Sequence, residues 1–262
     1  MKKSRNRGQT GFIGPAAFDT MGSGGVSTTM TEFRVMTSGA FAAAHQALIP
    51  QVERLTKAKV VTASTSIGTG EMSIPKRLKR GEVVDIVIVA EHVLRQLVAE
   101  GLALAEGLKI IARSSIAFAV RAGAPKPDIG SADALRRTLL QAKSIGYSAS
   151  ESGKYFSGEL VQRLGIADEV LPKSRLIGGG ERVGAVIARG EAEIGLQQVS
   201  ELLPVPGIEH VTPLPPELQK ISTFAAGVAA SCPNPSLART VIEFLASPRA
   251  ADAIGKSSLQ TP

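Results

Sequence analysis

Short apolar runs alternate along the chain with longer segments whose apolar residues recur at helical spacing. The clearest strand-like runs in the first half are residues 33–36, 59–63 and 85–90. Between the first two, an alanine-rich segment places Phe41, Ala44 and Leu48 on one helical face. After its first residue the third run is continuously apolar, which is typical of a strand buried on both faces. This order of strands and helices predicts a parallel, doubly wound α/β sheet.

The alternation continues in the second half. Strand-like runs are expected at 144–150, 192–198 and 222–230, and helices at 131–143, 151–165 and 181–190, with two more within 234–256. Each of the last two opens with a capping residue followed by proline, at Asn234-Pro235 and Ser247-Pro248. The second half is therefore expected to build its own α/β unit.

Two lobes follow from this order. Residues 109–123 form a run long enough to cross from one unit to the other, and residues from 222 onward provide a returning strand. Lobe one is expected to comprise residues 31–112 and 222–262, and lobe two residues 113–221.

The first 30 residues differ in composition from the rest. MKKSRNR has the basic character of the start of a secretory signal, but the continuous apolar stretch that should follow is missing. Gly, Ser, Thr and Pro dominate instead, so residues 1–30 are expected to be a disordered leader. Export is not established by the sequence alone.

Charge and composition exclude several classes of function. The net charge is +7, but +3 of it lies before residue 30, which leaves a mild excess on the other 232 residues. With 4% aromatic residues and no Trp, the chain has few stacking platforms, and no nucleic-acid partner is expected. No apolar run approaches the roughly 18 residues of a membrane span.

No metal or cofactor is expected. Cys232 is the only cysteine, and His45, His92 and His210 lack metal-ligand spacing. The glycines of IGGGERVGAV do not follow the phosphate-loop pattern, so a nucleotide site is not expected either.

Four segments share one design, in which a strand is followed by hydroxyl or glycine residues and then by a helix start. They are residues 37–41, 65–75, 148–155 and 177–186. In the first, Ser38 stands at an N-cap position, where free backbone N–H groups suit either an anion or simple helix capping. Because ligands of α/β sheets bind at the carboxyl ends of strands, several such loops facing one another favour a site for a small anion.

From about residue 32 to the end, the chain resembles the periplasmic molybdate-binding proteins of ABC importers, which are type 2 periplasmic binding proteins. The resemblance rests on FRVMTSGAFAAAHQALIPQVERLT, IPKRLKRGEVVDIVIVAE, SASESGKYFSGELVQRLG, GGGERVGAVIARGEAEIGLQQVSEL and the ending FLASPRAADAI. It implies two α/β lobes that close on an oxyanion held by hydroxyl and backbone N–H groups. It also implies a periplasmic location and an ABC permease as partner, and we expect a monomer.

The resemblance also suggests which residues contact the ligand. The expected set is Thr37, Ser38, Gly39, Ser66, Ser73, Ser152, Gly153, Tyr155, Arg182, Val183 and Gln198. Two members depart from the family pattern: Arg182 follows the glycines at a helix start, and Gln198 replaces a tyrosine. Since a guanidinium fork suits a carboxylate, an organic acid becomes a candidate ligand beside molybdate.

Two functions remain open at this stage. The first is capture of a small anion for an ABC importer, with no catalytic residue. The alternative is an enzyme like aconitate isomerase, which is similar to the same binding proteins and moves a proton next to a double bond. Such chemistry requires a base and an acid. The candidates for these roles are His45, Glu71, Glu151 and Tyr155.

Overall fold

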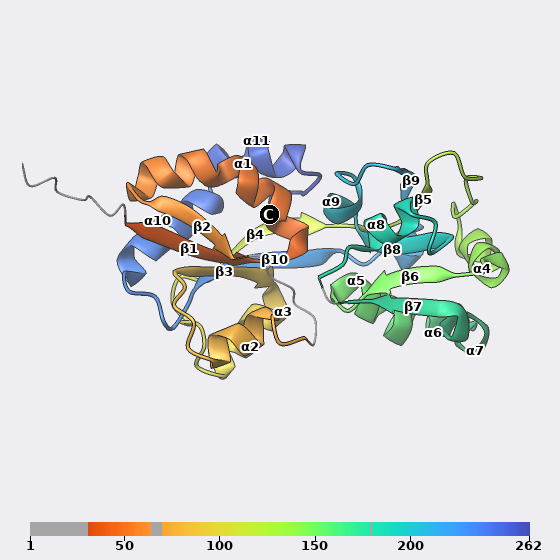
Figure 1. Cartoon of the computed structure of the whole chain (residues 1–262), viewed down its shortest axis with the longest axis horizontal. Coiled ribbons are helices and arrows are strands. Elements are labelled where there is room, and N and C mark those ends of the chain that lie inside the picture. Colours follow the sequence, from red (N-terminus) through yellow and green to blue (C-terminus); the bar gives the residue numbers. More distant parts are fainter. Residues whose placement is uncertain (1–30, 64–69, 179) are drawn as a thin grey trace, which may run out of the picture. The chain divides into compact units, whose positions relative to one another are not determined.

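The computed structural model describes residues 31–63, 70–178 and 180–262, and the predicted leader lies outside this range. The described chain forms two five-stranded sheets with helices around them (Figure 1). We call the first sheet with its helices lobe one, and the second lobe two. The predicted α/β class with two doubly wound lobes is confirmed.

The sheet of lobe one has the order β2-β1-β3-β10-β4. Its strands are β1 (Glu32–Thr37), β2 (Lys59–Ala63), β3 (Ile86–Ala90), β4 (Lys109–Ser114) and β10 (Ser222–Val228). β1 runs parallel to β2 and β3, whereas β10 runs antiparallel to β3 and β4. Every residue of β3 is buried, as its apolar run predicts.

Helices cover both faces of this sheet. They are α1 (Gly39–Thr56), α2 (Ile74–Lys79), α3 (Glu91–Ala99), α10 (Pro235–Leu245) and α11 (Pro248–Lys256). In Figure 1, α1 and α11 lie above the sheet and α2 and α3 below it. The predicted face of α1 is confirmed, since Phe41, Ala44 and Leu48 are all fully buried in the core of lobe one.

The sheet of lobe two has the order β7-β6-β8-β5-β9. Its strands are β5 (Ile116–Arg121), β6 (Ile145–Ser148), β7 (Ser174–Ile177), β8 (Ile194–Gln198) and β9 (Ile208–Pro213). Its α-helices are α4 (Ala132–Gln141), α5 (Glu151–Tyr155), α6 (Val161–Arg163), α7 (Ala167–Val170), α8 (Val183–Ala188) and α9 (Val199–Leu202). A π-helical turn, Phe156–Leu160, joins α5 to α6, and two 3₁₀ turns lie at Leu171–Lys173 and Pro216–Leu218.

Two chain segments cross between the lobes, and glutamine side chains link them. The first segment leads from β4 to β5 through Ser115, and the second leads from β9 to β10. Gln219 on the second segment accepts from Ile116 N at 2.9 Å and donates to Ile116 O at 3.0 Å. With its amide oriented to satisfy both ends, buried Gln198 donates to Ser115 O at 3.1 Å and accepts from Ser222 Oγ at 2.7 Å. Gln198 thus connects lobe two to both crossing segments.

His45 lies inside lobe one rather than on an open surface. Its ring is 2% exposed, and Nε2 is 2.7 Å from Thr62 Oγ1 on β2. Burial lowers the pKa of His45 from 6.5 to about 4, because the interior disfavours the charged ring. The imidazole is therefore neutral at neutral pH.

This lowered pKa predicts an acid-labile fold. Between pH 6.5 and about 4 the unfolded chain protonates His45 and the folded chain does not. As the pH is lowered through this window, His45 alone should reduce the free energy of unfolding by about 3 kcal/mol. Above pH 6.5 it should have no effect on stability. Urea unfolding of His45→Gln at several pH values should show a shallower fall than the unaltered protein. The matched control is His92→Gln, whose side chain is 58% exposed, and an identical pH slope in His45→Gln would contradict the assignment.

Candidate functional site

The N-terminus of α1 presents a polar group that the fold leaves unused. Ser38 occupies the N-cap position with extended backbone, as predicted, but its side chain makes no capping hydrogen bond. The hydroxyl is 2% exposed and has no hydrogen-bond partner among the described residues. The first N–H groups of a helix also have no intrahelical partner, and the helix dipole adds positive potential there. An oxyanion would satisfy all of these donors.

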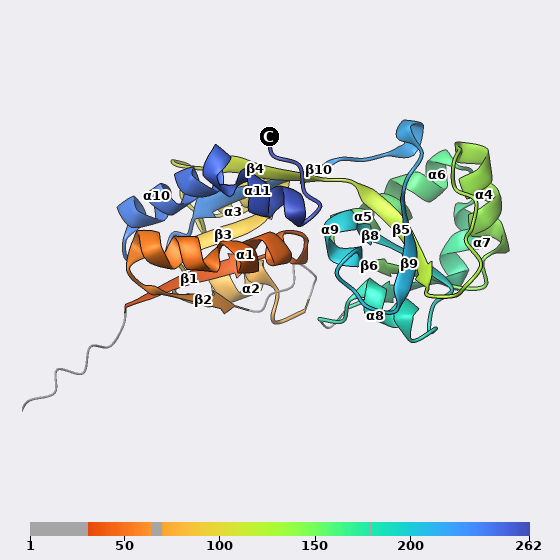
Figure 2. The same cartoon turned by 90° about the horizontal axis from the view of Figure 1, so that it is seen from above.

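The start of α9 in lobe two faces this helix end. α9 packs against α1, and both views of the chain place the end of α1 that begins at Gly39 beside α9 (Figures 1 and 2). A Cβ atom at Gly39 would overlap Glu201 Oε1, so the Glu201 carboxyl lies directly against the first residue of α1. Next to it on α9, the Ser200 hydroxyl is also 2% exposed and lacks a hydrogen-bond partner within the described chain.

The Glu201 carboxyl is strongly perturbed by this position. Its Oε1 accepts a hydrogen bond from Gln197 Nε2 at 2.9 Å. Burial of the carboxyl raises the pKa of Glu201 from 4.5 to about 7, although the positive charge of Arg182 and the bond from Gln197 act in the opposite direction. Glu201 is thus a carboxyl that exchanges its proton near neutral pH. Such groups gather at functional sites.

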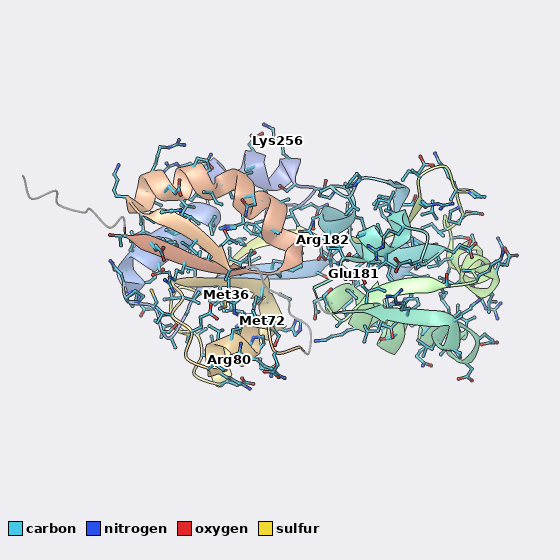
Figure 3. All side chains as sticks on the ribbon, in the orientation of Figure 1. Met36, Met72, Arg80, Glu181, Arg182 and Lys256 are labelled. Carbon is cyan, nitrogen blue, oxygen red and sulfur yellow. The ribbon has the colours of Figure 1, made fainter. Side chains whose placement is uncertain are left out.

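Arg182 is the N-cap residue of α8 and is exposed. Figure 3 shows it with Glu181 at the edge of lobe two nearest to α1. Glu181 pairs instead with Arg189, and more loosely with Arg175 at 3.8 Å. Arg182 makes no ion pair with another described residue, so its guanidinium is available to a ligand. Val183, which follows it, is fully buried in the apolar core of lobe two.

The start of α5 is closely packed. Ser152 is fully buried, with its Oγ 3.5 Å from Ser148 Oγ. A Cβ atom at Gly153 would collide with the Ser148 backbone carbonyl, so only glycine permits this approach. The Tyr155 hydroxyl donates to Leu218 O at 2.6 Å, which is a structural bond inside lobe two.

The remaining predicted residues lie in different surroundings. Ser73 is the buried N-cap residue of α2, and Ser66 lies outside the described residues. Glu71 is exposed and pairs with Lys76 at 2.5 Å and with Arg80 at 3.2 Å. The amide of Gln198 is taken up by the crossing segments.

Of the predicted set, Ser38, Gly39 and Arg182 are therefore brought together, and they meet around Glu201. Sequence reasoning missed both Glu201 and Ser200. The available signal was QQVSEL, where a strand is followed by a hydroxyl residue and a helix start, as in the other loops.

Glu151 makes a second contact between the lobes. Its Oε1 lies 3.0 Å from His92 Nε2 on α3. A depression of about 460 Å³ beside this pair is lined by charged side chains of both signs, among them Lys154, Glu159 and Lys220. Cations and carboxylates are mixed there, so this depression does not select for an anion.

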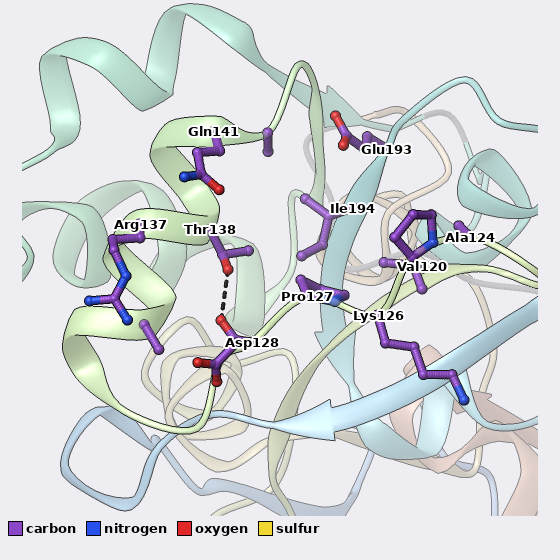
Figure 4. A pocket seen from close by; sticks show the side chains of 13 residues that line it. Val120, Ala124, Lys126, Pro127, Asp128, Arg137, Thr138, Gln141, Glu193 and Ile194 are labelled. Carbon is purple, nitrogen blue, oxygen red and sulfur yellow. Dashed lines mark hydrogen bonds between the residues drawn. The ribbon is translucent and has the colours of Figure 1, made fainter.

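Another pocket, of about 310 Å³, lies in lobe two beside α4 (Figure 4). Thr138 Oγ1 donates to Asp128 O across it at 2.7 Å, and Lys126, Arg137 and Glu193 also line it. It lies where Val120 pairs with Ile194, at the amino end of β8. Ligands of α/β sheets bind at the carboxyl ends of the strands, which is where β8 leads into α9. The pocket beside α4 is therefore at the wrong end of its sheet.

The described residues set two further limits. No helix within them is long and apolar enough to cross a membrane. Across the same ranges, no group of three or more His, Cys, Asp or Glu side chains is arranged to hold a metal ion.

Comparison with known proteins identifies the family of this chain. Aconitate isomerase of a Pseudomonas species is 39% identical over 232 residues, which is 88% of each chain. The periplasmic molybdate-binding protein of Azotobacter vinelandii superposes with a TM-score of 0.70 at 16% identity, over 88% of this chain and 99% of that one. The sulfate-binding protein of Mycobacterium tuberculosis gives a TM-score of 0.66 at 18% identity, over 87% and 86%. The family model for bacterial extracellular solute-binding proteins matches residues 33–258. The chain therefore belongs to the bacterial extracellular solute-binding protein family.

Proposed function

We propose that this protein captures a small anion with carboxylate groups between its two lobes. The observation that carries the proposal is the buried hydroxyl of Ser38 at the start of α1, with the guanidinium of Arg182 on the opposite lobe. Neither has a hydrogen-bond or ion-pair partner within the described residues. Hydroxyl and backbone N–H donors suit any oxyanion, and the relatives that bind molybdate and sulfate support an anion at this site. The planar fork of Arg182 favours a carboxylate, because it can donate two parallel hydrogen bonds.

Capture by closure of two lobes fits the linkage between them. We infer that residues 31–112 with 222–262 move as one body and residues 113–221 as the other. Gln198 and Gln219 hold the two crossing segments together, so bending is expected at Ser114–Ile116 and around Ser222. Such a hinge closes on a ligand that both lobes contact. As in other proteins of this class, we expect a monomer outside the cytoplasm that delivers its ligand to an ABC importer.

A second candidate function is isomerisation of aconitate, and the observation in its favour is the 39% identity to aconitate isomerase. This reaction removes a proton from the CH₂ group of the tricarboxylate. The electron pair shifts through the neighbouring double bond, and the proton returns to the far carbon. A group that holds a proton near neutral pH is needed. Glu201 meets this requirement better than neutral His45, paired Glu71 or bonded Tyr155.

Conversion of trans-aconitate separates the two candidates. The protein is incubated with trans-aconitate while the cis isomer is followed by NMR. A binding protein should show an upward shift in melting temperature and no cis isomer, since ligand at 100 times its Kd stabilises by about 2.7 kcal/mol. Turnover that persists through purification and is lost in Ser38→Ala would replace binding with isomerisation as the function.

Ser38→Ala should weaken anion binding without weakening the fold. Because the hydroxyl makes no capping bond, its loss should leave the melting temperature of the free protein nearly unchanged. Loss of one hydrogen bond to a charged ligand should lower affinity about tenfold. The matched control is Ser131→Ala, whose hydroxyl does cap α4 by accepting from Ala134 N at 3.2 Å. The control should lose about 1 kcal/mol of stability and retain affinity. The reverse pattern would make Ser38 purely structural.

Arg182 tests the ligand class. Arg182→Lys keeps the charge but loses the fork, so affinity for a tricarboxylate should fall about tenfold, and Arg182→Gln should reduce it further. Molybdate and sulfate should be affected less. Calorimetric titration of both variants is compared with Arg175→Lys, an exposed arginine already paired with Glu191 at 3.2 Å. Equal affinities in all proteins would remove the carboxylate preference.

A further inference from the structure

The Glu201 carboxyl lies at the N-terminus of α1, directly beside the position that a bound anion would take. It is in contact with Gly39, beside the unused hydroxyl groups of Ser38 and Ser200. The bond from Gln197 holds it in this position. A ligand oxygen that reaches Ser38 and the first N–H groups of α1 must therefore lie next to a carboxyl oxygen of the protein.

An ionised Glu201 and an anionic ligand beside it would repel each other strongly. In a site shielded from water, a second carboxylate within a few Å raises the pKa of the first. One proton held between the two groups removes the repulsion and provides a hydrogen bond. Glu201 is the described group best placed to hold that proton, because its own surroundings already favour the neutral form.

The other charged groups near α9 do not cancel this effect. α9 packs against α1, α8, β5, β8 and β9. From these elements, Arg182 at the start of α8 is the one whose charge acts on Glu201. On β5 and β9, Arg121 and Glu209 lie at the ends far from the crossing segments. The other charged side chains of these two helices are far from their N-termini. Glu53 and Arg54 lie near the C-terminus of α1, and Arg189 lies at the C-terminus of α8.

We propose that Glu201 is the proton-carrying contact of this site, which binds a small carboxylate anion in its protonated form and donates a hydrogen bond to it. The inference rests on the proposed anion-binding function and adds a specific rule of recognition. Ligand binding takes up a proton wherever free Glu201 is ionised. Above about pH 7 the association constant should therefore fall on the order of tenfold per pH unit, and below that it should level off.

Calorimetry in two buffers with different ionisation enthalpies tests this directly. The probe is trans-aconitate, whose carboxyl groups are all ionised in this range. At about pH 8 the unaltered protein should take up close to one proton per ligand bound. His45 is neutral under these conditions and does not contribute. This measurement needs no variant, so it does not depend on whether a substitution folds.

Glu201→Gln provides the second arm. The amide imitates the protonated acid, so the variant should take up no proton and bind equally well across the pH range. Its matched control, Glu151→Gln, alters the other carboxyl between the lobes and should keep the uptake. Binding of trans-aconitate without proton uptake, or with the same pH dependence in Glu201→Gln, would overturn the role of Glu201 alone. Absence of binding of both trans-aconitate and molybdate even at acidic pH would overturn the proposed function and this inference together.

Discussion

The contact between the start of α1 and the start of α9 is the interaction on which the proposed binding site depends. Each element brings a buried hydroxyl without a partner, and a carboxyl from α9 lies on the helix end that attracts negative charge. Unmet buried polar groups cost free energy, so a fold keeps them when something else gains from them. In the proposed function, the gain is a set of donors on two lobes that a bound anion would complete.

The linkage between the lobes is compatible with this arrangement. Each sheet is built around its own apolar core, and the clusters of lobe two are separate from that of lobe one. The crossing segments are tied to each other and to β8 by the amide side chains of Gln198 and Gln219. The proposed closure would change the surroundings of Glu201 and Arg182 while each apolar core stays intact. In the proposed function, the groups that contact the ligand are thus the groups whose surroundings change when the lobes close.

Much of the fold could be predicted from the polarity pattern, because its strands stand out as short apolar runs between amphipathic helices. Residues 59–63 form β2 as predicted, and 86–90 form β3 within one residue of the prediction. Edge strand β7 was missed because its burial gives no alternation, with Leu176 55% exposed. The run 109–123 contains two strands that belong to different sheets and are joined at Ser115. The polar residues Arg113, Ser114 and Ser115 interrupt the apolar run at this division, close to the predicted boundary at 112/113.

The site was less predictable than the fold. Ser38 could be found because a helix start shows itself locally, and Arg182 because a cation at a helix start is unusual. Glu201 follows a strand and a hydroxyl residue in QQVSEL, but what distinguishes it is its contact with Gly39, a residue distant in sequence. Gln198 was expected from the resemblance, because it stands where the family has a tyrosine, and in the structure its amide bonds to the crossing segments.

The most direct measurement of the central claim is a crystal structure of the protein with a bound tricarboxylate. The account predicts ligand oxygens within hydrogen-bond distance of Ser38 Oγ and the first N–H groups of α1. It also predicts a guanidinium contact from Arg182 and a short carboxyl–carboxylate contact to Glu201. Ligand density in the pocket beside α4, or at the α1 start with Glu201 turned away into solvent, would contradict it.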